Sequence, residues 1–456
     1  MAEDRAERDE DALAMERMDA VLAAVQAGDV ARLDVLFDPL HAADIADILE
    51  QINTSERAAL LALWHGGIDG EVLSEIDESI REEVIAALPD SVVNEAMREL
   101  ETDDLVDILE DLETPAQDKI LEALDLADRV AVQQALSYPE YSAGRLMQRE
   151  VVVAPEHWTV GEAIDFLRGA EELPDQFYHV ILTDPRIKPV GFVTLGRILS
   201  SARTVRLRDI VEETFRTVSA TDEEADVAYI FNQYHLISCP VVDGDGRLVG
   251  VITIDDAMNV LDEEHEEDML RMAGVGDESA ISDRVLETMR LRMPWLFVNL
   301  LTAILASLVI SRFEDVIVQV VALAVLMPIV ASMGGNAATQ SLTVAVRALS
   351  TRDLTGANVS RVIWRETAVG LVNGVFFAVI MGLISAYWFQ DHLLGIVIGV
   401  AMVVNLVVAG MAGIVVPVMM ERAGVDPALA SGTFVTTVTD VVGFFVFLGL
   451  AAVVLI

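Results

Sequence analysis

A single carboxylate lies deep inside the last apolar segment of this chain. Asp440 is about ten residues past the start of that segment, which is roughly 15 Å of helix and close to the middle of a membrane core about 30 Å thick. An uncompensated charge at that depth is strongly unfavourable. Thr436 and Thr437 share a helix face with Asp440, so together they offer oxygen ligands to a hard cation. The alternative is a buried aspartate that hydrogen-bonds to neighbouring helices.

A second polar stretch covers residues 328–340, within the second apolar segment. Its proline and its pair of glycines predict a broken helix, which a membrane tolerates only where the freed backbone is buried in protein or lines a wet cavity. Asn336 and Gln340 are one helical turn apart, so with Gly335 they predict a pore lining. Close packing of helices through small residues is the alternative.

Five apolar stretches are long enough to cross a membrane. Arginines gather before the first stretch and around the loop between the second and third, whereas the loops on the other side carry only Arg312. This bias places the N-terminus in the cytosol and the C-terminus outside. Asn299 and Asn405, each alone in an apolar stretch, predict hydrogen bonds between helices. The stretches lie near residues 291–310, 316–346, 368–389, 393–420 and 430–456.

The negative charge is concentrated in front of these stretches. Residues 287–456 hold 8 Lys/Arg and 9 Asp/Glu, so the preceding part holds 22 and 65, which is about −43 of the net −44. Such a field repels nucleic acid and attracts cations. A merely solvated surface is the alternative, but an excess of this size predicts ligands that sense a divalent ion. The candidates are Asp103, Asp104, Asp107, Asp255, Asp262, Glu263, Glu264, Glu266, Glu267 and Asp268.

The front portion divides into a helical part and a mixed part. Residues 44–50 resemble residues 104–110 at an offset of 60, which predicts stacked helix pairs. Further on, short β-rich runs alternate with helices, and a glycine–apolar–apolar–threonine phrase begins at both Gly191 and Gly250. One long acidic helix is expected over residues 255–282. The expected domains are an all-α helical repeat (1–137), an α+β tandem pair (138–256), an acidic connecting helix (257–285) and a five-span α-helical transmembrane domain (286–456).

The mixed part resembles a tandem pair of CBS modules, small regulatory domains that often bind adenine nucleotides. The second copy keeps Thr253 and Asp256 at the spacing that contacts a ribose in such modules. The first copy has Thr194 but Arg197 in place of the acidic residue. The resemblance implies a nucleotide site, with ATP as a candidate cofactor, at Tyr178, Pro240, Thr253 and Asp256.

The order of the parts resembles the MgtE family of bacterial magnesium channels, and residues 40–46, 138–147, 328–340 and 426–443 carry the match. The resemblance implies a homodimer with a pore on its two-fold axis, in which Asp440 and its symmetry mate hold a hydrated Mg²⁺. One departure is Gly432-Thr433, where the family pattern has a residue followed by proline. The residues also fit Mg²⁺ directly, because this ion keeps its waters and is held by one or two carboxylates.

We expect a Mg²⁺-selective channel for magnesium uptake in the bacterial inner membrane, closed when cytosolic Mg²⁺ binds the acidic front portion. Asp426, at the cytosolic entrance of the last segment, is expected to meet this sensor. Two alternatives stay open: a proton-coupled divalent-cation transporter, and a membrane-anchored nucleotide sensor. The sequence contains no phosphate-binding Gly-Lys-Ser/Thr loop, no Gly-x-Ser-x-Gly and no His-Glu-x-x-His, so neither an ATP-driven pump nor an enzyme is expected.

Overall fold

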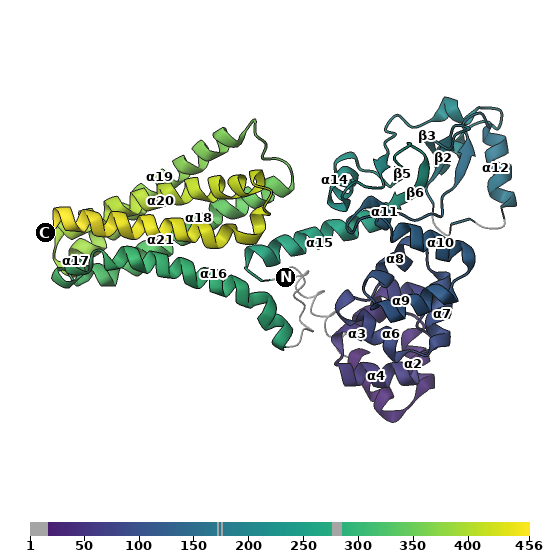
Figure 1. Ribbon diagram of the computed structural model, residues 1–456, viewed down its shortest axis with the longest axis horizontal. Coiled ribbons are helices and arrows are strands. Elements are labelled where there is room, and N and C mark those ends of the chain that lie inside the picture. The colour runs from purple at the N-terminus through teal and green to yellow at the C-terminus, as the bar shows by residue number, and fades with distance from the viewer. Residues whose placement is uncertain (1–16, 171–172, 175–176, 276–284) are drawn as a thin grey trace, which may run out of the picture. The chain divides into compact units, whose positions relative to one another are not determined.

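The computed structural model describes residues 17–170, 173–174, 177–275 and 285–456. The chain divides between Asp262 and Glu263 into two compact units. The first unit holds a helical part and a mixed part, and the second holds long apolar helices, so the expected fold classes are confirmed (Figure 1).

Short helices follow one another through the helical part of the first unit. The predicted repeat is present in the helices, because α3 and α4 recur at an offset of 60 as α8 and α9. Asn53 caps α4, since its side chain accepts hydrogen bonds from the backbone N–H of Ser55 and Glu56 at 3.0 Å each. The helices are α2 (Val30–Phe37), α3 (Ala42–Gln51), α4 (Thr54–Leu63), α5 (Gly70–Ser74), α6 (Glu78–Ala87), α7 (Asp90–Glu99), α8 (Thr102–Glu110), α9 (Thr114–Ala123) and α10 (Leu126–Ala135).

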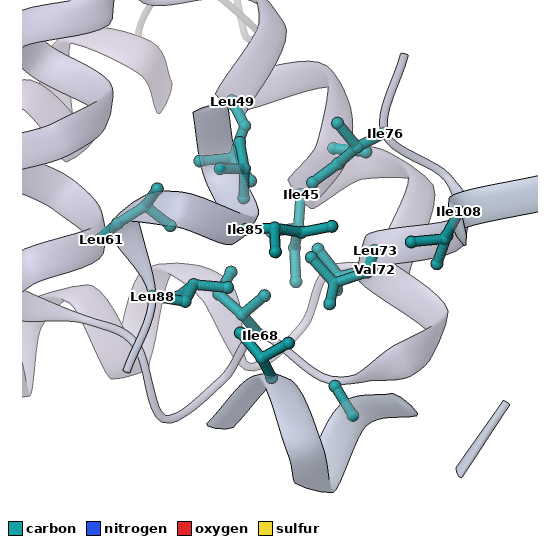
Figure 2. Packing of buried hydrophobic residues seen from close by; sticks show 14 of the residues in the cluster. Ile45, Leu49, Leu61, Ile68, Val72, Leu73, Ile76, Ile85, Leu88 and Ile108 are labelled. Carbon is teal, nitrogen blue, oxygen red and sulfur yellow. The ribbon is translucent and has the colours of Figure 1, made fainter. Parts of the chain in front are cut away.

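One continuous apolar core holds these helices together. Figure 2 shows Ile45 and Leu49 of α3 beside Val72 of α5 and Ile85 of α6, all of them buried. Each helix contributes the apolar stripe that its 3.6-residue period places on one side. Ile108 of α8 belongs to the same cluster, so α8 is fixed in position by packing.

The mixed part contains two three-stranded sheets with the same topology. In each sheet the first strand is parallel and the third antiparallel to the central strand. Gly191 pairs with Leu182 and Gly250 pairs with Val241, so the two glycine phrases occupy equivalent positions. The elements are α11 (Ala143–Leu146), β1 (Val153–Pro155), α12 (Val160–Gly169), β2 (His179–Thr183), β3 (Pro189–Thr194), α13 (Leu195–Ser200), η1 (Leu207–Ile210), β4 (Val218–Ser219), α14 (Glu224–Tyr234), β5 (Ser238–Val242) and β6 (Leu248–Thr253).

The connecting helix is shorter than expected. Helix α15 (Ile254–Met272) follows β6 directly and ends at Met272, whereas the sequence predicted helix to about residue 282. Gly274 has a φ of +71°, a left-handed conformation that stops the helix. Residues 276–284 of the expected helix lie outside the described residues. The first half of α15 belongs to the first unit and its second half to the second unit.

The second unit contains five helices long and apolar enough to cross a membrane. Helix α20 is the centre of the bundle, because 61% of the residues in its most apolar part are buried, whereas the corresponding share in α16 is 6%. Close approach needs small residues: a Cβ on Gly410 of α20 would lie 2.5 Å from the carbonyl oxygen of Glu366 in α19. The helices are α16 (Val285–Ser311), α18 (Ala322–Ser350), α19 (Val359–Phe389), α20 (His392–Arg422) and α21 (Pro427–Val454), with the short α17 (Glu314–Gln319) before α18.

The predicted break at residues 328–340 is wrong. Helix α18 runs without interruption from Ala322 to Ser350, and the chain is interrupted earlier, between α17 and α18. Pro328 lies in the second turn of α18, where it removes one backbone hydrogen bond without ending the helix. Gly334 serves close packing, which was the alternative interpretation of this stretch, whereas Gly335 has room for a side chain.

Candidate ion-conducting site

Asp440 occupies the middle of α21. Its side chain is half-buried, and no described residue donates a hydrogen bond to its carboxylate. The hydroxyls of Thr436 and Thr437 donate to the carbonyl oxygens of Gly432 (2.9 Å) and Thr433 (2.6 Å), one turn earlier. Their oxygen lone pairs are therefore left to accept hydrogen bonds from water molecules around an ion. The expected carboxylate and hydroxyls lie on one helix, and the carboxylate lacks a protein partner.

Helix α18 carries an exposed polar stripe. Asn336 and Gln340 were predicted from the sequence, and Ser332, Thr339 and Thr343 extend the same face. At 100° per residue these five positions fall within about 100° of the helix circumference. Exposed polar groups on a membrane helix are unfavourable against lipid, so this stripe requires a water-filled cavity or another protein chain. Its spacing was a signal in the sequence that would have identified the three additional residues.

The polar faces of α18 and α21 are adjacent. A Cβ on Gly335 would lie 3.8 Å from the Cγ2 atom of Thr436, so the backbone of α18 passes beside the threonines of α21. The Nδ2 atom of Asn336 lies 3.4 Å from Oγ of Ser332 on its own helix. The structure therefore brings Gly335 and Thr436 together, one residue from Asn336 and one turn from Asp440.

Gly334 of α18 and Asn405 of α20 form a tight contact that fixes the position of α18. The buried Asn405 of α20 donates through Nδ2 to the carbonyl oxygen of Val330 at 2.9 Å. This confirms the prediction that Asn405 forms a hydrogen bond between helices. A Cβ on Gly334 would lie 2.2 Å from the same nitrogen, so only glycine leaves room for the amide. Asn299 is exposed on α16, and its expected bond is not among the described contacts.

We expect Gly334→Ala to destabilise the bundle, because the new methyl group overlaps the amide of Asn405. The cost is about 1–3 kcal/mol for an overpacked interior. Thermal unfolding of the protein in detergent measures it, with Gly356→Ala as control, since no atom lies within 4 Å of a Cβ there. Asn405→Ala in the Gly334→Ala background should recover part of the loss. A variant as stable as the parent would show that this contact is not tight.

A second carboxylate near the membrane end of α19 was missed. Glu366 accepts a hydrogen bond from the Ser341 hydroxyl of α18 at 3.1 Å and pairs with Arg365 at 3.0 Å. The sequence placed the third span at residues 368–389, so Glu366 was counted in a loop. Since α19 begins at Val359, Glu366 lies inside the helix and links it to α18.

The last turn of α15 contacts the beginning of α21. Asp426 caps α21 through the N–H of Ala428 at 2.7 Å, and its second oxygen accepts from Arg271 at 2.9 Å. Arg271 also pairs with Glu267 at 2.7 Å. Met272 packs against the apolar cluster formed by Leu342, Val346 and Ala428. The connecting helix thus ends at the entrance of the α18–α21 face.

The carboxylates around this entrance outnumber the arginine that joins them. Burial raises the pKa of Asp268, which also hydrogen-bonds to Ser350, and the negative charge of Asp426 raises it further. Asp268, Asp426 and Glu267 all lie near the single guanidinium of Arg271. An added cation at this entrance would therefore be favourable.

A second acidic group forms within the first unit, where α8 meets the start of α15. Asp103 is buried, and burial followed by the charge of Asp256 raises its pKa well above the ordinary value. Burial, with Asp107 and Asp255, raises the pKa of Asp104 to about 6. Burial raises the pKa of Asp256 to about 7, although the hydrogen bond from Thr253 lowers it. We name Asp103, Asp104, Asp255 and Asp256 the acidic junction.

The remaining predicted sensor residues differ in their surroundings. Asp107 pairs with the buried Arg81 at 2.9 Å, so its charge is partly compensated. Asp262, Glu263 and Glu266 are exposed, and Glu264 is half-buried. Among the described residues, no group of three or more His, Cys, Asp or Glu side chains is arranged to hold a metal ion. Neither acidic group is therefore a preformed coordination shell.

The predicted nucleotide residues lie on or beside three strands, since Pro240 is in the central strand β5, Tyr178 directly precedes β2, and Thr253 ends β6. The Thr253 hydroxyl donates to Asp256 at 2.7 Å. Tyr178 is exposed at the start of β2, whereas Pro240 is buried in β5. The two sheets are linked beside them, because Nδ1 of His179 lies 2.6 Å from Oγ of Ser238.

Family models match about three quarters of the chain. Residues 40–141 match the MgtE intracellular N domain, residues 143–203 and 207–263 match CBS domains, and residues 327–450 match the divalent cation transporter domain of MgtE. A magnesium transporter MgtE of Thermus thermophilus is 32% identical over 437 residues, covering 95% of this chain and 97% of the relative. The chain belongs to the MgtE family. The resemblance inferred from the sequence is confirmed.

A second relative agrees with this assignment. A magnesium transporter MgtE of Bacillus subtilis is 30% identical over 70% of this chain and 71% of its own length. Among solved structures, the cytosolic domain of the Mg²⁺ channel MgtE in complex with ATP is 28% identical, covers 53% of this chain and 99% of that one, and has a TM-score of 0.49. This MgtE-family chain is a membrane transporter with five candidate spans and not an enzyme.

Proposed function

We propose that this chain is a Mg²⁺-selective channel that takes up magnesium into the bacterial cell. The observation that carries the proposal is the half-buried carboxylate of Asp440, which has no partner among the described residues and lies beside the exposed polar stripe of α18. Mg²⁺ is usually held through its water shell with one or two carboxylates. The hydroxyl and amide oxygens beside Asp440 can accept hydrogen bonds from that shell. The magnesium transporters that this chain resembles support the choice of ion.

We infer that the functional unit is a homodimer in which two copies face each other across the polar stripes. A membrane helix that exposes five polar side chains in one copy has an incomplete surface. A second copy related by a two-fold axis would enclose these groups and bring two Asp440 carboxylates to one ion. Arginines at residues 347, 352, 361 and 365 support an orientation with the N-terminus cytosolic and the C-terminus outside.

We propose further that cytosolic Mg²⁺ closes the channel. A divalent ion would reduce the repulsion between carboxylates at two places. One is the acidic junction, where burial and neighbouring charges raise the pKa values, and the other is the acidic entrance at Asp426. Helix α15 begins at the first group and ends at the second, so a change in its position would reach the entrance. ATP at the CBS pair belongs to the same proposal, because a ribose hydroxyl would donate to Asp256 beside Thr253.

Flux into proteoliposomes tests the channel. Mg²⁺ influx into vesicles containing the purified protein should follow an imposed inside-negative potential of about 100 mV, which for a divalent ion is worth roughly 4–5 kcal/mol. It should persist when the pH is equal on both sides. Influx that stops without a pH gradient would favour proton-coupled transport, and the absence of any flux from correctly inserted protein would favour a membrane-anchored sensor.

A further inference from the structure

A pocket of about 380 Å³ lies at one end of the membrane bundle, and no residue of the polar stripe lines it. It lies between the α18–α19 connection and the last turns of α20. Its apolar wall consists of Leu349, Leu354, Val359 and Val418, of which Leu354 and Val418 are buried. A wall of this kind would accept the first carbons of a lipid chain.

The pocket lies at the depth of lipid headgroups. Helix α18 ends, α19 begins and α20 ends at this place, so three candidate spans leave the apolar layer together. Trp364, which follows the pocket residue Val359 on α19, is 73% exposed. Tryptophan is enriched at the boundary between hydrocarbon and water. The position of Trp364 is independent support for this depth.

The charged rim combines two guanidinium groups and one carboxylate. Arg352, Arg422 and Glu421 line the pocket. Within the part of the chain that the structure describes, neither Arg422 nor Glu421 forms an ion pair. Arg352 has a φ of +56°, which non-glycine residues rarely adopt, and its N–H donates to Leu349 at 2.9 Å. Guanidinium groups match phosphate oxygens in a bidentate geometry.

We propose that this pocket binds the headgroup of an anionic phospholipid that has one phosphodiester and free hydroxyls, of the phosphatidylglycerol type. The phosphate would lie between Arg352 and Arg422, and a headgroup hydroxyl would donate to Glu421. A choline headgroup offers no hydrogen-bond donor to Glu421, and a second phosphate would face its carboxylate. Because no residue of the polar stripe lines the pocket, lipid binding there does not depend on the proposed function.

Lipid retention by the full-length protein in detergent tests this assignment. Native mass spectrometry with an equimolar mixture of phosphatidylglycerol and phosphatidylcholine should show selective retention of phosphatidylglycerol. Arg352→Gln combined with Arg422→Gln should weaken that retention roughly tenfold or more, as expected for lost charge-assisted contacts. Arg312→Gln is the matched control, because Arg312 is exposed at a helix end outside the pocket.

Competition in the unmodified protein keeps the proposal testable if the double variant folds poorly. Excess phosphatidylcholine or millimolar inorganic phosphate should leave bound phosphatidylglycerol in place. Displacement by either would overturn the assignment, since it would indicate general lipid adhesion or a simple phosphate site. Equal retention by the folded double variant would also overturn it. Retention is measured without transport, so its failure is distinct from failure of the channel.

Discussion

Asp440→Asn is expected to abolish magnesium uptake. The substitution preserves the shape of the side chain but removes the charge, and in a two-fold pore it removes both charges at once. Loss of even one favourable carboxylate contact of about 1.4 kcal/mol weakens ion binding tenfold. The measurement is growth of a host that lacks its own magnesium uptake, at limiting Mg²⁺, with membrane expression checked for each variant.

Two companion variants separate this effect from a folding defect. Glu314→Gln removes an exposed carboxylate from the first turn of α17 and should rescue growth like the parent. Asp440→Glu keeps the charge and should retain more uptake than Asp440→Asn. Full rescue by Asp440→Asn at normal expression would refute an ion site at this position.

Neutralising the acidic junction is expected to produce a channel that Mg²⁺ no longer closes. In Asp104→Asn combined with Asp256→Asn, two of the four carboxyl groups can no longer ionise, so a divalent ion gains little by binding. Protection of the full-length variant from limited proteolysis should then need at least about tenfold more Mg²⁺ than protection of the parent. Asp118→Asn with Glu122→Gln removes the same charge from exposed positions of α9 and serves as control.

The pH dependence of this protection has a definite sign. Asp104 and Asp256 have folded-state pKa values of about 6 and about 7, raised from 3.8, so the folded protein binds more protons than the unfolded chain between about pH 4 and 7. Their contribution to stability without divalent ions therefore falls as the pH rises through this range. Mg²⁺ must displace these protons, so protection at pH 5.5 should need at least about tenfold more Mg²⁺ than at pH 7.5. Protection that is equal at both pH values, or unchanged in the double variant, would place the sensor elsewhere.

Features set by local pattern could be predicted from the sequence. The repeat at an offset of 60 appears as the pairs α3–α4 and α8–α9, because capping by Asn53 and apolar periodicity act within a few residues. The glycine phrases at Gly191 and Gly250 fall in equivalent strands for the same reason. The depth of Asp440 in its helix followed from counting residues at a fixed rise.

Features that depend on a partner far away in the sequence could not be predicted. The glycine pair in α18 predicted a break, but Gly334 instead makes room for Asn405, which is far away in the sequence. Asp256 was assigned only to nucleotide binding, whereas its carboxylate also belongs to the group formed with Asp103 and Asp104. Net charge predicted a sensing region, but it did not show which carboxylates would be buried together.

Because α18 is uninterrupted, a force at one end of this helix would displace its residues in proportion to their distance from the pivot. An unbroken helix tilts as a rod, and the tight contact of Gly334 with Asn405 is the natural pivot. Val346, where Met272 packs, lies roughly 18 Å along the axis from that pivot, but Asn336 lies only about 3 Å from it. A tilt of about 5° would therefore displace the entrance by roughly 1.6 Å and the ion site by about 0.3 Å. The entrance would therefore move about five times as far as the ion site, so a closure at the entrance would leave the geometry of the ion site almost unchanged.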